Sequence, residues 1–114
     1  MIEITDKYIK NGQLDKEALA EFGADVVAFE GDRIVFKTDI VFYECNSLAS
    51  VSGAVFNSDV LFETCKHLIS VDGATFNGIV AFWRCDSLAS VSGATFKKGL
   101  KADNCPNLKQ EELE

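Results

Sequence analysis

The chain has 114 residues, which is long enough for one domain with one continuous core and too short for two. Hydrophobic residues make up 47% of it and charged residues 25%, and these ordinary globular proportions exclude the disordered and fibrous classes. A net charge of -7 repels phosphate backbones, so we expect no direct nucleic-acid binding and an attraction to basic partner surfaces.

The N-terminal part predicts a small cap on the domain. Residues 1–4 lack the basic and apolar regions of a secretory signal, and no apolar run in the chain is long enough to cross a bilayer. We therefore expect a cytoplasmic protein with no membrane partner. Asp15 and Gly23 bracket residues that favour a short helix, with Asp15 as its N-cap and Gly23 at its C-terminal end. We assign residues 1–25 to an N-terminal helical cap.

A weak copy of a repeat follows this cap. Its residues fit the template of the later copies if Asp32-Arg33 is a two-residue insertion at a corner. The fitting residues are Val26, Phe29, Gly31, Phe36, Ile40 and Phe42. Terminal repeats are expected to be atypical, so we count this segment as the first coil.

A period of twenty residues governs the rest of the chain. Residues 40–59, 60–79 and 80–99 align without a gap, and residues 100–109 begin a fourth copy. Each complete copy carries the phrase Phe-x-x-Cys-x-x-Leu-x-x-Val-x-Gly-x-x-Phe. These spacings match neither a helical period nor plain alternation. A coil that turns corners explains them, because each apolar residue then points inward and stacks on its equivalent in the next coil.

The corners and the final residues complete this prediction. The glycines of the phrase, Gly53, Gly73 and Gly93, permit the positive φ that a tight corner requires. We assign residues 26–109 to a solenoid of four to five coils and residues 110–114 to a C-terminal tail that covers its other end. Leu113-Glu114 is typical of the residues that precede a purification tag, so no inference rests on them.

The segment Val80-Ala-Phe-Trp-Arg-Cys-Asp-Ser-Leu-Ala-Ser-Val-Ser-Gly-Ala-Thr-Phe96 resembles a leucine-rich repeat, in which a short L-x-L strand precedes x-x-(N or C)-x-x-L. It is most similar to the short repeats of bacterial and phage leucine-rich-repeat-like proteins. The resemblance covers residues 26–108 and implies a mainly β repeat solenoid of right-handed parallel coils. If a phage encodes the protein, it would act in the host cytoplasm. The pentapeptide-repeat helix also has twenty residues per coil, but Lys66 breaks its five-residue register, and we reject it.

The strand-lined wall of such a solenoid predicts a binding surface. If Phe42, Phe62 and Phe82 point inward, their neighbours point outward and form continuous rows across the coils. Exposed aromatic residues and arginine are enriched in binding hot spots. The alternative is that the apolar members pack under the N-terminal helix or are tolerated surface residues. The predicted partner-binding residues are Val41, Tyr43, Glu44, Leu61, Glu63, Trp83, Arg84, Lys101 and Asp103.

The residues that could carry chemistry favour no catalytic or metal site. The four cysteines recur every twenty residues, so stacking places them in a column, and we expect a buried ladder of free thiols with no metal. His67 occupies a turn position and has no neighbour that a nucleophile needs. The carboxylates of Glu44, Glu63 and Asp103 share a face without an implied cleft. We predict no catalytic residue and no cofactor.

Three functions remain open at this point. The leading hypothesis is a non-enzymatic module that binds a protein through the strand-lined face. The alternative is a small acidic inhibitor, of the phage anti-defence type, that blocks a basic nucleic-acid-binding surface of a host protein. The third is self-association into a homo-oligomer through the strand face or the coil ends.

Overall fold

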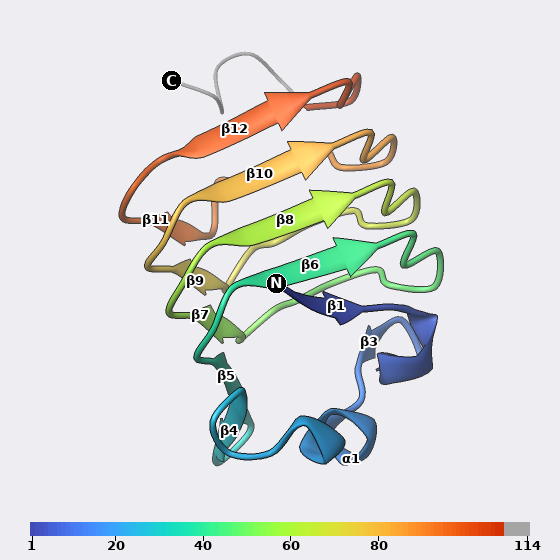
Figure 1. The fold of residues 1–114 in the computed structure, drawn as a ribbon. Helices are drawn as coiled ribbons and strands as arrows, with labels where there is room; N and C mark the ends of the chain where they lie inside the picture. The colour runs from blue at the N-terminus through green and yellow to red at the C-terminus, as the bar shows by residue number, and fades with distance from the viewer. Residues whose placement is uncertain (109–114) are drawn as a thin grey trace.

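The repeats stack as the parallel coils of a β-solenoid (Figure 1) in the computed structural model, which describes residues 1–108. The first four residues of each coil form one wall, a parallel sheet with strand order β1-β6-β8-β10-β12. Equivalent residues pair without a register shift, as Phe42 does with Phe62 and Phe62 with Phe82. The strands of this sheet are β1 (Ile2–Ile4), β6 (Ile40–Tyr43), β8 (Val60–Glu63), β10 (Val80–Trp83) and β12 (Leu100–Asp103).

A second sheet forms the opposite wall, with strand order β11-β9-β7-β5-β4. Single bridges join Ser50 to Ser70 and Ser70 to Ser90, and they close the remaining side of each coil. The second sheet contains β4 (Val27–Glu30), β5 (Arg33–Phe36), β7 (Val55–Phe56), β9 (Thr75–Phe76) and β11 (Thr95–Phe96).

The core consists of columns of identical side chains, as the repeat predicted. Phe42 and Phe62 stack with ring centroids 4.7 Å apart, and Phe62 and Phe82 with centroids 5.1 Å apart. A second column runs from Phe36 through the phenylalanines of β7, β9 and β11, with stacked centroids 4.9 to 5.2 Å apart. Rings of the two columns meet edge to face. Each such pair contributes about 0.5–1.5 kcal/mol beyond the area that it buries.

Left-handed residues turn the chain at two kinds of corner. Gly53 and Gly73 have φ values of 81° and 84°, as predicted, whereas Gly93 does not adopt a positive φ. Instead, a Cβ on Gly93 would lie 2.8 Å from Asp72, so close approach is what requires glycine there. The second kind of corner follows each strand of the first sheet and is left-handed without glycine, with φ between 49° and 58° at Glu44, Thr64, Arg84 and Asn104.

The first coil differs from the prediction, because the N-terminus supplies half of it. Strand β1 pairs in parallel with β6, so that Ile2 lies beside Ile40 and Ile4 beside Phe42. After the 3-10 helix η1 (Asp6–Tyr8), a tight Asn11-Gly12 turn joins β2 (Ile9–Lys10) to the antiparallel β3 (Gln13–Leu14). Residues 1–25 are therefore not a purely helical cap, since Ile2–Ile4 continue the wall of the solenoid.

The predicted helix is present and short. It comprises α1 (Lys16–Leu19) and the 3-10 helix η2 (Ala20–Phe22). The Asp15 carboxylate accepts a hydrogen bond from the Glu17 amide at 3.1 Å, and Gly23 ends the helix with a φ of 82°, so both predicted ends are confirmed. Figure 1 shows α1 at one end of the solenoid, away from the outer face of β6, β8 and β10.

The segment that was expected to be a degenerate coil is a β-hairpin. Strands β4 and β5 are antiparallel, and Gly31-Asp32 is the two-residue loop between them, with a φ of 64° at Gly31. The prediction of a corner with an Asp32-Arg33 insertion was wrong because glycine at the first loop position favours a tight hairpin turn. Phe29 is 39% exposed as a result, whereas Phe36 enters the core.

At the other end of the solenoid, Leu108 is the last buried residue of the described chain. The C-terminal tail predicted at 110–114, like Lys109, lies outside the described residues. Within residues 1–108, no helix is long and apolar enough to cross a membrane.

Candidate functional site

The outer face of the first sheet presents the row of side chains that the repeat predicted. Tyr43 pairs with Glu63, Glu63 with Trp83, and Trp83 with Asp103, so these four residues lie on adjacent strands and on one face. Tyr43 is 40% and Trp83 46% exposed, so neither packs under the helix. Two large aromatic side chains therefore face solvent from a rigid sheet.

The neighbouring row is less exposed than predicted. Val41, Leu61 and Ala81 are half-buried, and among the predicted residues of this row only Lys101 is exposed. Leu61 is partly covered because a strand pairs on each side of it, through Val41 and Ala81. Glu3 joins this row beside Val41, since β1 belongs to the sheet. The sequence prediction missed Glu3 because it placed residues 1–25 outside the coils.

A shallow hollow of about 260 Å³ opens at the C-terminal ends of β8, β10 and β12. Glu63, Trp83, Arg84, Asp103 and Asn104 line it. Four of these residues were predicted to bind a partner, and Asn104 is the fifth, which the predicted set does not include. Within residues 1–108, the carboxylates of Glu63 and Asp103 form no hydrogen bond or ion pair, so both are available to a ligand.

The residues after the strands are held in place by the next coil. The amides of Glu44, Thr64 and Arg84 donate to the carbonyls of Glu63, Trp83 and Asp103 at 2.9, 2.8 and 2.9 Å. These hydrogen bonds continue the parallel ladder one residue beyond strands β6, β8 and β10. Glu44 and Arg84 are exposed, so this corner holds their backbones at the edge of the face.

The electrostatic field at the strand-lined face is negative, and it changes the pKa of Tyr43. Nearby negative charge raises the pKa of Tyr43, with Glu44 as the main cause through its charge and then its hydrogen bond. Partial desolvation and the charges of Glu63 and Glu3 add to the rise. An anion is therefore repelled from this end of the row and a cation is attracted.

Other acidic residues serve the corners of the coils. Asp6 accepts hydrogen bonds from the Ser47 hydroxyl at 2.7 Å and from the Ser47 amide at 3.0 Å. Asp39 accepts from the Ser58 hydroxyl and from the Asp59 amide. The Asp72 carboxylate accepts from the Gly93 amide at 3.0 Å. Asp6, Asp39 and Asp72 thus have a structural role at the corners, whereas Glu63 and Asp103 on the strand-lined face form no such hydrogen bonds within residues 1–108.

The cysteines form the predicted ladder of free thiols. The thiols of Cys45, Cys65 and Cys85 are buried. They donate to the carbonyls of Ile4, Phe42 and Phe62, each on the strand of the previous coil, at 3.2, 3.5 and 3.5 Å. The neighbouring Cys45 thiol and burial raise the pKa of Cys65 to about 12. A thiol that stays protonated at neutral pH is a poor nucleophile and metal ligand. Among residues 1–108, no three metal-ligating side chains come together.

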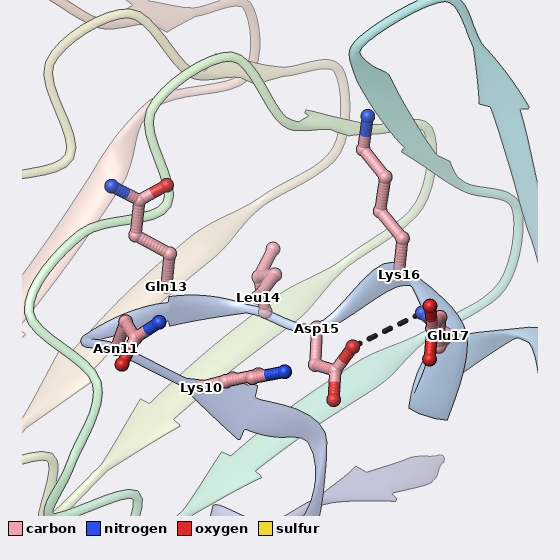
Figure 2. A pocket seen from close by; sticks show the side chains of 7 residues that line it. All are labelled: Lys10, Asn11, Gln13, Leu14, Asp15, Lys16 and Glu17. Atoms are coloured by element: carbon pink, nitrogen blue, oxygen red, sulfur yellow. Dashed lines mark hydrogen bonds between the residues drawn. The ribbon is translucent and has the colours of Figure 1, made fainter.

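A larger hollow of about 490 Å³ lies where the β2–β3 hairpin meets α1 (Figure 2). The Asp15 carboxylate caps α1, and the Lys16 side chain points away from it. Lys16 Nζ lies 3.6 Å from Asp32 Oδ1. His67, likewise, is an exposed turn residue, as predicted. The strand-lined face is thus the better candidate.

Comparison with family models, curated proteins and solved structures finds no match to this chain. The resemblance to short leucine-rich repeats stays a prediction. The candidate site therefore rests on its own geometry.

Proposed function

We propose that this chain is a non-enzymatic protein-binding module whose strand-lined face docks a partner protein. The observation that carries the proposal is the exposure of Tyr43 and Trp83 on one row of a sheet whose core is stacked phenylalanine. Tryptophan and tyrosine on a rigid surface give large contact area at little cost in conformational entropy. The buried free thiols suit a reducing compartment, and we propose the cytoplasm as the place of action.

Capture of a partner from a lysate of the source cell tests this proposal. Trp83→Ala should abolish capture, and its circular dichroism spectrum should match that of the unmodified chain because Trp83 lies outside the core. Ile69→Ala is the matched control, since Ile69 is 57% exposed and lies outside the predicted patch. The proposal fails if W83A captures the same partner as well as I69A does.

A second candidate function is an acidic inhibitor that blocks a basic nucleic-acid-binding surface. The observation that favours it is the gathering of Glu3, Glu44, Glu63 and Asp103 on and beside the strand-lined face. Salt separates the two candidates, because binding through charge weakens steeply as ionic strength rises, whereas binding through an aromatic patch persists. Self-association is a third proposal, and a monomer mass that stays constant across a concentration series in light scattering excludes it.

A further inference from the structure

The hollow beside Trp83 combines an exposed aromatic ring with unpaired carboxylates on both sides. Glu63 and Asp103 are the register partners of Trp83 on the two neighbouring strands. Adjacent strands lie about 4.8 Å apart, so the backbones of Glu63 and Asp103 are about 9.6 Å apart with Trp83 between them. Neither carboxylate has a hydrogen bond or ion pair with the rest of the described chain. Both carboxylates are therefore available to pair with a group outside the molecule.

The size and charge of the hollow indicate which ligand it can bind. Its volume of about 260 Å³ is smaller than the roughly 300–1,000 Å³ of sites that hold small-molecule ligands, and it suits one side chain. Two negative groups and one positive group, Arg84, line it. Cations bind the faces of indole rings within about 6 Å, and tryptophan is the best of the aromatic residues for this contact. An anion would meet two carboxylates.

We propose that the hollow binds a lysine or arginine side chain from a basic segment of the partner protein, with the cation against Trp83 and between Glu63 and Asp103. This inference rests on the proposed function, because it assigns the chemistry of the partner at the same face. The negative field that raises the pKa of Tyr43 extends the attraction to the neighbouring strand. Arg84 opposes the ligand's charge and so limits the affinity of the empty hollow for free cations.

The single tryptophan of the chain is the reporter for a direct test. The probe is the acetylated and amidated tripeptide Gly-Lys-Gly, and Gly-Gln-Gly is its neutral counterpart. The lysine peptide should change the fluorescence of Trp83 in a saturable way, and the glutamine peptide should not. Because exposed charge pairs contribute little, we expect Glu63→Gln to raise the dissociation constant by about threefold to fivefold.

Two further variants separate a local site from the effect of net charge. Glu30→Gln removes the same charge from the exposed β4–β5 hairpin, and it should leave the dissociation constant nearly unchanged. Arg84→Gln removes the positive group that lines the hollow, so it should tighten binding of the lysine peptide. Equal effects of E63Q and E30Q would overturn the inference, and so would equal binding of the two peptides or weaker binding by R84Q.

The partner-capture experiment distinguishes failure of this inference from failure of the proposed function. If W83A loses the partner while E63Q keeps it and binds the lysine peptide as before, the face is the interface and the cation inference is wrong. If W83A keeps the partner while the peptide results hold, the hollow binds a cation but the face is not the interface.

Discussion

The left-handed residue after β8 gives a quantitative test of how the strand-lined face is built. Thr64 has a φ of 58°, a region that β-branched residues avoid. Asn104 occupies the equivalent position after β12 with a φ of 57°, and asparagine is one of the few non-glycine residues that adopt this region readily. Thr64→Asn should therefore stabilise the domain.

The size of the gain follows from what the substitution keeps and removes. The left-handed conformation costs ordinary residues roughly 1–2 kcal/mol, and T64N should recover about 1 kcal/mol of it. The backbone amide, which donates to the Trp83 carbonyl at 2.8 Å, is unaffected. A gain of about 1 kcal/mol raises the Tm of a domain of this size by about 4 °C.

Thermal unfolding followed by circular dichroism measures this difference. Thr95→Asn is the control, because Thr95 is exposed in β11 and has no positive φ. Asparagine is a poor strand former, so T95N should lower the Tm slightly. A T64N variant that melts at or below the temperature of the unmodified chain would refute the assignment of strain to this corner.

Two other predictions concern the coil and its thiols. A Cβ on Gly78 would lie 2.5 Å from the Ser58 carbonyl carbon. Gly78→Ala should therefore lower the free energy of unfolding, measured in urea, by about 1–3 kcal/mol. Lys98→Ala, at the same position of the next coil, is the control and should change this free energy little. The pKa of Cys65 is about 12 when folded and roughly 8.5 when unfolded, so the unfolded chain releases its proton first as pH rises. The contribution of Cys65 to the free energy of unfolding should therefore be fully present below about pH 8.5, and it should decrease above that pH by up to about 1.4 kcal/mol per pH unit. The decrease should be less steep in Cys65→Ala. A free energy of unfolding in urea that is independent of pH between about 8 and 11 would contradict this expectation.

The sequence was sufficient to predict the coils, because each inward position recurs at a fixed spacing. Phe42, Phe62 and Phe82 occupy the same place three times, and only a stacked coil buries all three. The outward direction of Tyr43 and Trp83 followed from the same alternation. A periodic signal is averaged over its copies, which makes it more reliable than any single propensity.

The N-terminal part was harder to predict because it appears once. The Ile2-Glu3-Ile4 alternation is three residues long, and its pairing with β6 is a long-range contact that no local pattern specifies. The Asn11-Gly12 turn does carry a local signal, since Asn-Gly favours a two-residue hairpin, but the predicted helical cap does not include a hairpin. The Gly31-Asp32 hairpin turn also carries a local signal, whereas the predicted corner with an Asp32-Arg33 insertion followed from the repeat template alone.

The details of the site depend on these tertiary contacts. Glu3 reaches the strand-lined face only because β1 extends the sheet, and Asn104 lines the hollow only because β12 stacks on β10. The partial burial of Leu61 follows from neighbours on both sides, which the sequence of one coil does not show. Sequence patterns therefore predicted the face and its aromatic residues but not the shape of the hollow.

The acidic residues of this solenoid fall into two groups, those that accept hydrogen bonds at the corners and those on the strand-lined face that do not. Asp39 and Asp72 accept hydrogen bonds from backbone amides at the corners, and hydrogen bonds that carboxylates accept are among the stronger ones, so their replacement should cost stability. Glu63 and Asp103 have no such partner within residues 1–108 and stand in a row where the backbone repeats but the side chains do not. Because identical backbones carry tyrosine, glutamate, tryptophan and aspartate there, folding does not dictate the choice. We propose that a binding partner sets the chemistry at this row, and the charge and the indole of the row favour a basic segment as that partner.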